Sequence, residues 1–267
     1  MGTLAGRRAF ITGSFQGIGL GVATALAAEG CSIVLHGIAD EQQISAAAQQ
    51  VAAAGARTVE TFTSDLRDSV ATEALVAQIL AAGPVDILVN NAGIQFTAPI
   101  AEMPRAKWND IIAINLSASF DTMRLLLPQM AARGYGRVIN VASVHGLVAS
   151  VDKAPYVSAK FGIVGLTKVA ALEYAAQGEG ARGGVTVNAI CPGWVETPLI
   201  GPQIQARADT HGGDREAAIA DLLSEKQPSR RLSAPSEIGM LAAWLCDPRA
   251  HNITGSAIPV DGGWTAQ

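Results

Sequence analysis

The stretch Thr12-Gly13-Ser14-Phe15-Gln16-Gly17-Ile18-Gly19 decides the fold, because it places glycines where a short apolar strand gives way to an alanine-rich helix. Glycine lets the backbone turn tightly and approach a pyrophosphate, while the start of the helix supplies N–H donors and a positive dipole. The spacing is G-x-x-x-G-x-G, not the dinucleotide-binding pattern G-x-G-x-x-G. Glycine-rich turns between a strand and a helix are purely structural about as often as they bind a nucleotide. The turn therefore predicts a dinucleotide site only if the surrounding pattern agrees.

The rest of the chain alternates short strands with helices. Strands are expected at 8–12, 32–36, 58–63, 85–90, 137–142, 185–190 and 256–260. Helices are expected at 18–29, 40–54, 69–82, 104–133, 156–177 and 236–246. This alternation demands a parallel sheet covered on both faces, with ligands beyond the carboxyl ends of its strands.

No linker is long enough to mark a second domain. The sequence therefore predicts one doubly wound, Rossmann-type α/β domain over 1–267, with a mainly parallel sheet of about seven strands. Residues 199–227 carry glycines and charges but few strand formers. They are expected to form one or two helices that act as a lid over the substrate.

The composition describes a globular chain. Of its 267 residues, 49% are apolar and 16% charged, so a sizeable core can form. The net charge is -4 without a basic stripe, which argues against nucleic acid or an anionic membrane as partner. Charged residues or glycines interrupt each long apolar stretch, so no transmembrane helix is expected. Three distant cysteines, and histidines without metal-ligand spacing, favour a metal-free protein of the reducing cytoplasm.

Tyr156 and Lys160 lie one turn apart on the same face of the helix expected over 156–177. Tyrosine is a poor acid or base at neutral pH, because its ordinary pKa is about 10. A lysine ammonium one turn away favours the phenolate and lowers that pKa toward working pH. The hydroxyl of Ser143, upstream, could hold the reacting oxygen. These residues predict a proton relay of the kind that carbonyl–alcohol hydride transfer needs.

The turns that follow the first four strands predict the nucleotide site. The candidate residues are Gly13, Phe15, Gly17, Ile18, Gly19, Asp65, Leu66, Asn91, Ala92 and Gly93. Asn90-Asn91-Ala92-Gly93 could also be an ordinary turn, since Asn and Gly both tolerate a left-handed backbone. The second strand ends in Leu35-His36-Gly37-Ile38-Ala39, without an acid for a ribose 2′-hydroxyl. No Arg or Lys stands between Gly13 and Asp40 for a 2′-phosphate, so the expected cofactor is NAD rather than NADP.

In their order and spacing, these motifs resemble those of the short-chain dehydrogenase/reductase family, and the resemblance covers essentially the whole chain. It rests on the 12–19 turn, the 90–93 turn, Asn115, Ser143, Tyr156-x-x-x-Lys160 and Cys191-Pro192-Gly193. The resemblance implies that Tyr156 is the catalytic acid/base and that Lys160 lowers its pKa and binds the nicotinamide ribose. It also implies that Ser143 orients the substrate oxygen and Asn115 supports a relay water. The implied nicotinamide contacts are Pro192, Gly193, Val195 and Thr197.

Finer segments resemble the members of that family that interconvert D-3-hydroxybutyrate and acetoacetate. These segments are 91–95, 143–150, 153–156, 191–195 and 224–229. The resemblance implies that Gln95, His145, Lys153 and Gln203 bind the substrate carboxylate. Trp194 either packs on the substrate or closes the core beside the nicotinamide. A free acid in a site that excludes water needs a cation and hydrogen-bond donors, which these residues supply.

Other functions remain open at this stage. The same fold could reduce a 3-ketoacyl thioester or oxidise a polyol, and a catalytically idle nucleotide sensor is the alternative outside enzymes. An intact Ser143–Tyr156–Lys160 set argues against the sensor, which needs no proton relay. The resemblance further implies a homotetramer packed through the long helices.

Overall fold

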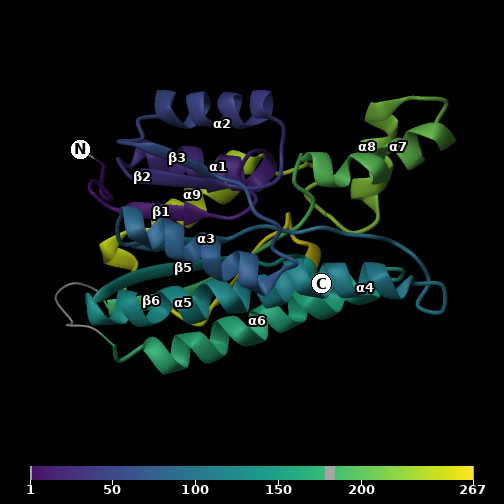
Figure 1. Cartoon of the computed structure of the whole chain (residues 1–267). Helices are drawn as coiled ribbons and strands as arrows, with labels where there is room; N and C mark the ends of the chain where they lie inside the picture. Colours follow the sequence, from purple (N-terminus) through teal and green to yellow (C-terminus); the bar gives the residue numbers. More distant parts are fainter. Residues whose placement is uncertain (1, 178–183, 267) are drawn as a thin grey trace.

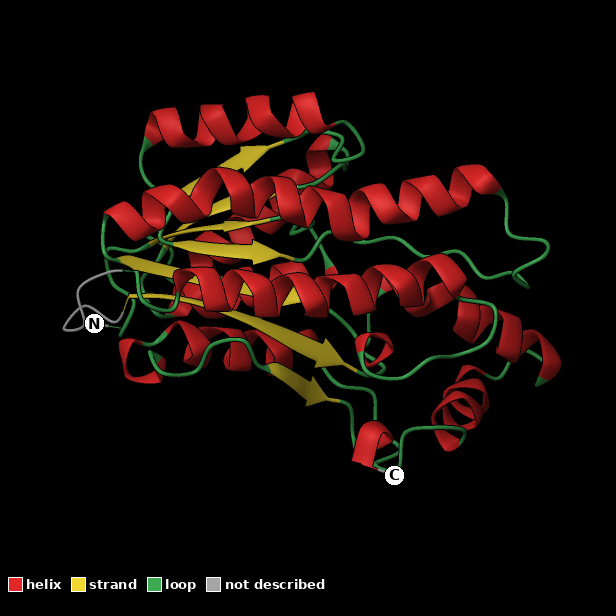
Figure 2. Ribbon diagram, turned by 90° about the horizontal axis from the view of Figure 1, so that it is seen from below, coloured by secondary structure: helices red, strands yellow, loops and turns green. Residues whose placement is uncertain are grey.

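The computed structural model describes residues 2–177 and 184–266, in which seven parallel strands form one sheet of order β3-β2-β1-β4-β5-β6-β7. The strands are β1 (Arg8–Ile11), β2 (Ser32–His36), β3 (Val59–Phe62), β4 (Ile87–Asn90), β5 (Tyr135–Val141), β6 (Gly184–Pro192) and β7 (Ala257–Val260). Their arrowheads point the same way in Figure 2, toward the loops that carry the site. The predicted fold class is confirmed.

Helices cover both faces of the sheet (Figure 1). They are α1 (Gly17–Ala28), α2 (Glu41–Ala53), α3 (Ser69–Ala82), α4 (Arg105–Ile112), α5 (Ala118–Ala132), α6 (Ala154–Tyr174), α7 (Gly201–Thr210), α8 (Arg215–Ser224) and α9 (Pro235–Cys246). One apolar core joins the sheet to α1, α2 and α9, and a second joins it to α3, α5 and α6. The central strands β1, β2 and β4 are buried on both faces, which explains why their sequences are mostly apolar rather than alternating.

The expected helix over 104–133 consists of α4, a π-helical turn η1 (Ala113–Ser117) and α5. A π-helical turn widens a helix locally and is frequent at functional sites. This turn contains Asn115, which is 1% exposed. The break in regular α-helix therefore coincides with a predicted site residue.

The stretch Arg105–Ala132 is long and apolar enough to cross a bilayer, if length and composition alone are considered. Its α5 portion packs against α3, β4 and β5, and buries residues such as Leu126, Leu127 and Met130. Its outer side carries Arg124, which bonds to Asp121, and the exposed Phe120. Packing against the sheet therefore accounts for the apolar character of this helix.

Two helices, α7 and α8, occupy the predicted lid segment. They pack on each other through Ile204, Ala208, Ala218 and Leu222, and Trp194 lies against the same cluster. Figure 1 shows this pair set apart from the helices that cover the sheet. The helical content matches the expectation, while the closing of a lid stays a prediction.

Candidate active site

A cavity of about 440 Å³ opens at the carboxyl ends of β1 to β4. In the sheet order β1 lies between β2 and β4, so the chain reverses direction across the sheet at this place. Open α/β sheets bind their ligands at such a switch point. The predicted residues that line the cavity are Gly13, Phe15, Gly17, Ile18, Asp65, Leu66, Asn91, Ala92, Gly93, Tyr156, Lys160 and Thr197.

The glycine turn is held open by its neighbours. Gly13 has φ +63°, and a Cβ there would come within 2.8 Å of the Cα of Ala92. Gly19 lines neither this cavity nor the smaller pocket described below, because it lies behind the turn, where a Cβ would meet the carbonyl oxygen of Gly13 at 2.4 Å. Asn91 Nδ2 donates to the carbonyl oxygens of Thr12 and Gly13 at 2.9 and 2.8 Å. The turn thus leaves a cradle that side chains would fill, and Asn91 fixes its shape.

The far end of the cavity contains polar groups that the sequence did not identify as site residues. Gln16 and Gln43 both line it, and Gln43 Nε2 donates to Gln16 Oε1 at 3.0 Å. His36 also lines it and is 2% exposed, and burial lowers the pKa of its imidazole to about 4. Gln16 caps the start of α1, His36 ends β2 and Gln43 lies in the first turn of α2. Their places at the carboxyl ends of strands are the signal that could have identified them.

Asp65, which we expected to contact the adenine, is already occupied. Its carboxylate accepts bonds from the side chain of Arg67 at 2.9 and 2.5 Å, and these bonds lower its pKa. Arg67 is half-exposed and also lies 3.7 Å from Asp110. Arg67 directly follows Asp65 and Leu66, which line this end of the cavity. Arg57 comes before β3, away from the lining residues.

Tyr156 and Lys160 lie side by side on α6 at the inner end of the cavity. The Lys160 ammonium is 5.6 Å from the centre of the Tyr156 ring and donates to the carbonyl oxygen of Val141 at 2.7 Å. Burial lowers the pKa of Lys160 to about 8. Burial raises the pKa of the Tyr156 phenol, and a hydrogen bond with Ser143 acts in the opposite direction. The three predicted relay residues are therefore brought together, but burial raises the pKa of Tyr156 above its ordinary value, so the expected lowering of that pKa by Lys160 is not found.

Asn115 lines neither pocket, and its side chain supports the wall instead. Asn115 Oδ1 accepts from the backbone N–H of Ile94 at 2.9 Å, and Nδ2 donates to the Ile94 carbonyl oxygen at 2.9 Å. These bonds fix the loop after β4, which includes Gly93 and Gln95. The arrangement holds that loop in place next to η1.

A smaller pocket of about 70 Å³ shares Ile18, Tyr156 and Thr197 with the cavity and continues from it. Its predicted lining residues are Ile18, Gln95, Ser143, His145, Lys153, Tyr156, Pro192, Gly193, Trp194, Val195 and Thr197. Gln203 does not line it but reaches it indirectly, because its Oε1 accepts from Lys153 Nζ at 3.4 Å. Gln95 Nε2 donates to the carbonyl oxygen of Leu199, at the edge of the lid segment.

Lys153 is the buried cation of this pocket. It precedes α6 as its N-cap residue, is 8% exposed, and its ammonium lies 5.1 Å from the centre of the Trp194 ring. Burial first, and the charge of Lys226 second, lower its pKa to about 8. Among the described residues no carboxylate forms an ion pair with it. A desolvated cation without a counter-ion is the feature that a bound anion would satisfy.

His145 lies between Tyr156 and Trp264, with ring-centre distances of 6.0 and 5.5 Å. Burial and the charge of Lys153 lower the pKa of its imidazole to about 4, so the ring is neutral at neutral pH. Within the described chain, His145 Nδ1 and Trp194 Nε1 are buried without hydrogen-bond partners. Both residues line the smaller pocket.

Trp264 and Lys226 complete this wall and were not predicted. Trp264 lines the pocket and lies 5.9 Å from Trp194, ring centre to ring centre. It follows β7 through Asp261-Gly262-Gly263, so it stands at the carboxyl end of a parallel strand. That position is where the general rule places ligand contacts, and it could have identified Trp264. Lys226 lies in the segment 224–229 that carries part of the finer resemblance, but that resemblance assigned it no role.

In the ranges 2–177 and 184–266, no group of three or more His, Cys, Asp or Glu residues could hold a metal ion. Cys31, Cys191 and Cys246 are free and buried, and burial raises the pKa of Cys191 to about 11. The pocket chemistry is therefore that of hydroxyl, amide, imidazole and ammonium groups.

Residues 7–208 match the model of the short chain dehydrogenase family. The chain is 48% identical to D-beta-hydroxybutyrate dehydrogenase of Cupriavidus necator, over 99% of this chain and 100% of that protein. It is 44% identical to D-beta-hydroxybutyrate dehydrogenase of Rhizobium meliloti, over 98% and 99% of the two chains. Among solved structures, L-sorbose reductase from Gluconobacter frateurii, complexed with NADPH and L-sorbose, is 30% identical with a TM-score of 0.92, over 100% of both chains.

Proposed function

The chain belongs to the short-chain dehydrogenase/reductase family, and on that premise we propose that it interconverts D-3-hydroxybutyrate, or a similar short 3-hydroxy acid, and the 3-keto acid with NAD. The observation that carries this proposal is Lys153, a buried ammonium without a carboxylate partner in the described chain, in the same small pocket as Ser143 and Tyr156. The two hydroxybutyrate dehydrogenases named above support the same substrate class.

The larger cavity fits a dinucleotide. The close approach of Gly13 to Ala92 leaves a space that a Cβ would fill, next to the N-terminus of α1. The nicotinamide supplies the hydride acceptor or donor when it is bound. We propose NAD rather than NADP, because the neutral amides of Gln16 and Gln43 line the adenosine end and Arg67 is engaged with Asp65.

Tyr156 takes the hydroxyl proton during oxidation and returns it during reduction. Ser143 hydrogen-bonds to Tyr156 and faces the same pocket, which orients the reacting oxygen between the two hydroxyl groups. The Lys160 charge, close to the phenol ring, favours the phenolate that burial alone disfavours. The side chain of Asn115 holds the loop after β4, and we propose that Asn115 supports a relay water.

Lys153, His145, Gln95 and Gln203 form the proposed carboxylate site. Lys153 provides the charge, and neutral His145 provides a hydrogen bond from an imidazole nitrogen. Gln203 already bonds to Lys153, and Gln95 joins the pocket to Leu199 at the start of the lid segment. We propose that binding of the acid draws α7 and α8 over the pocket.

We also propose a homotetramer in the cytoplasm. Exposed apolar side chains on the outer sides of α5 and α6, namely Phe120, Phe161, Val169 and Leu172, support packing through the long helices. The free thiols of the three cysteines support a reducing compartment.

The test compares 3-hydroxybutyrate with its methyl ester on the wild type, Lys153→Ala and Arg57→Ala. Truncation of one partner of a desolvated charge pair costs about 2–5 kcal/mol, or roughly 30-fold to several thousand-fold in kcat/KM. We expect that loss for the acid only, and no change for Arg57→Ala, an exposed cation outside the pocket. If the wild type oxidises the ester as well as the acid, no carboxylate site exists, and a polyol or thioester substrate replaces the hydroxy acid.

A further inference from the structure

Lys226 connects the end of the lid to the wall of the substrate pocket. It follows α8, and its ammonium group donates to Ser150 Oγ at 2.9 Å. Ser150 lies in the loop that runs from Ser143 to Lys153. The same ammonium lies 5.6 Å from the centre of the Trp264 ring, which lines the pocket. Lys226 itself is half-buried behind this wall and does not line the pocket.

The next residue anchors this segment to the other wall. Gln227 is 1% exposed, and its Oε1 accepts from the backbone N–H of Trp194 at 3.0 Å. A Cβ at Gly193 would come within 2.7 Å of that oxygen. The chain after α8 is therefore fixed between the 193–194 loop and the Ser150 loop, which keeps the Lys226 charge at a set distance from the pocket.

Two positive charges, Lys153 and Lys226, face this wall without a compensating carboxylate. In the part of the chain that the structure describes, neither ammonium forms an ion pair. Glu225, beside Lys226, is bonded to Arg207 at 2.6 Å, and Asp152, in the Ser150 loop, pairs with neither lysine. The neighbouring His145 is neutral at neutral pH.

We propose that Lys226 is a second cation of the substrate site, a positioning residue that selects anionic substrates from behind Trp264 and fixes the Ser150 loop. This inference rests on the proposed carboxylate site at Lys153. A carboxylate bound at Lys153 would be attracted by both charges, directly by Lys153 and more weakly by the half-buried Lys226, whose ammonium lies over the Trp264 ring. The pocket would then discriminate against neutral substrates more strongly than one lysine allows.

The experiment uses Lys226→Gln, which keeps a hydrogen-bond donor toward Ser150 and removes the charge, and Lys226→Arg, which keeps the charge. We expect Lys226→Gln to raise KM for 3-hydroxybutyrate by roughly tenfold, as expected for a nearby screened charge. Its kcat, and both constants for the methyl ester, should stay within about twofold of wild type. Lys226→Arg should retain most of the affinity for 3-hydroxybutyrate. Arg57→Gln removes one positive charge at an exposed site, as Lys226→Gln does behind the pocket, and should leave KM unchanged.

A second readout separates charge from structure. Lys226 is one cause of the lowered pKa of Lys153, so its removal should move the alkaline loss of acid binding to higher pH. The KM for the acid should also become less sensitive to salt. An equal loss for acid and ester, with an unmoved pH profile, would overturn the role of Lys226. The carboxylate site itself fails only if the wild type shows no preference for the acid.

Discussion

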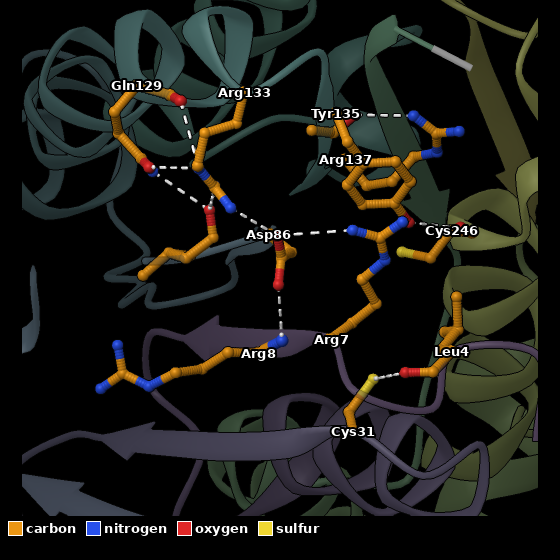
Figure 3. A network of polar contacts seen from close by, with 12 residues as sticks. Leu4, Arg7, Arg8, Cys31, Asp86, Gln129, Arg133, Tyr135, Arg137 and Cys246 are labelled. Atoms are coloured by element: carbon orange, nitrogen blue, oxygen red, sulfur yellow. Dashed lines mark hydrogen bonds and ion pairs between the residues drawn. The ribbon is translucent and has the colours of Figure 1, made fainter. Parts of the chain in front are cut away.

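Cations lie at both ends of the strands. At the amino ends, here called the amino edge, two arginines share a carboxylate, whereas at the carboxyl ends, the carboxyl edge, Lys153 has no carboxylate partner among the described residues. At the amino edge, Asp86 is 6% exposed and lies 2.7 Å from Arg133 and 3.7 Å from Arg7 (Figure 3). Its second oxygen accepts from the backbone N–H of Arg8 at 3.0 Å. Two arginines therefore share this one carboxylate.

The same network continues through stacked rings. The guanidinium groups of Arg7 and Arg137 lie 3.5 and 4.5 Å from the centre of the Tyr135 ring (Figure 3). Arg137 is fully buried, and it donates to the carbonyl oxygens of Gly136 and Gly184. A planar guanidinium suits such fixed, stacked positions. These cations are parts of the fold.

At the carboxyl edge, Lys153 donates to Gln203 and Lys226 donates to Ser150. Both acceptors are neutral and do not compensate the lysine charges. Lys160 donates to a main-chain carbonyl of β5. A buried cation that lines a pocket and has no carboxylate partner can pair with an anionic ligand. The contrast teaches that the cations of the amino edge share a carboxylate, stack on a ring or bond to carbonyl oxygens within the fold, whereas Lys153 lines a pocket with only a neutral partner.

The largest effect is expected at the reacting end. Tyr156→Phe removes the proton that the relay transfers, and kcat should fall at least ~10²-fold, the usual scale for general acid–base catalysis. Binding of NAD, followed by fluorescence or calorimetry, should be retained. Tyr174→Phe, the same change near the end of α6, is the matched control. Turnover near that of wild type would remove Tyr156 from the mechanism.

A substitution at the amino edge should lower the free energy of unfolding rather than the catalytic rate. Asp86→Asn leaves Arg133 and Arg7 without their shared carboxylate. Because both arginines are about one-third exposed, we expect a loss of roughly 2–3 kcal/mol rather than the larger cost of a sealed pair. Thermal unfolding should show a Tm lower by about 5 °C or more. Asp209→Asn, at an exposed site, should leave Tm unchanged, and kcat at 25 °C should be normal in both variants.

The pH dependence sharpens the comparison. The pKa of Lys153 lies at about 8, below its ordinary value, so the lysine loses its charge as pH rises through 8. The ratio of kcat/KM for acid and methyl ester should be flat below pH 8 and fall by up to about tenfold per pH unit above it. Ionisation of Tyr156 changes kcat/KM equally for the acid and the ester, so it does not affect this ratio. In Lys153→Arg the ratio should stay flat to higher pH, and a flat ratio in the wild type would contradict a binding lysine.

The smallest effect concerns the nucleotide. NAD should be preferred over NADP in kcat/KM, because a 2′-phosphate would meet the neutral Gln16–Gln43 pair. Gln16→Lys places a cation there and should narrow the preference by roughly tenfold. Gln49→Lys, on the exposed side of α2, is the control. An equal use of both nucleotides by the wild type would show that Arg67 leaves Asp65 and serves the phosphate.

Local pattern was sufficient for the fold. The predicted strands differ from the observed ones by about two residues or fewer at each end, because buried parallel strands are continuous apolar runs. The helix with Tyr156 starts at Ala154, since Pro155 favours the first turn of a helix. Spacing also brought Tyr156 and Lys160 to one helix face, because i and i+4 are neighbours in any α-helix.

The sequence by itself therefore determined the sheet, the glycine turn, the relay pair and the family. Only the tertiary structure decided that Lys153 is buried without a carboxylate partner in the described ranges, that Arg67 pairs with Asp65, and that Asn115 bonds to Ile94. It also brought Lys226 into contact with Trp264 and Ser150, both of which are distant from it in sequence. Helix and strand periods repeat over a few residues and can be read locally, whereas burial and charge balance depend on which distant segments meet.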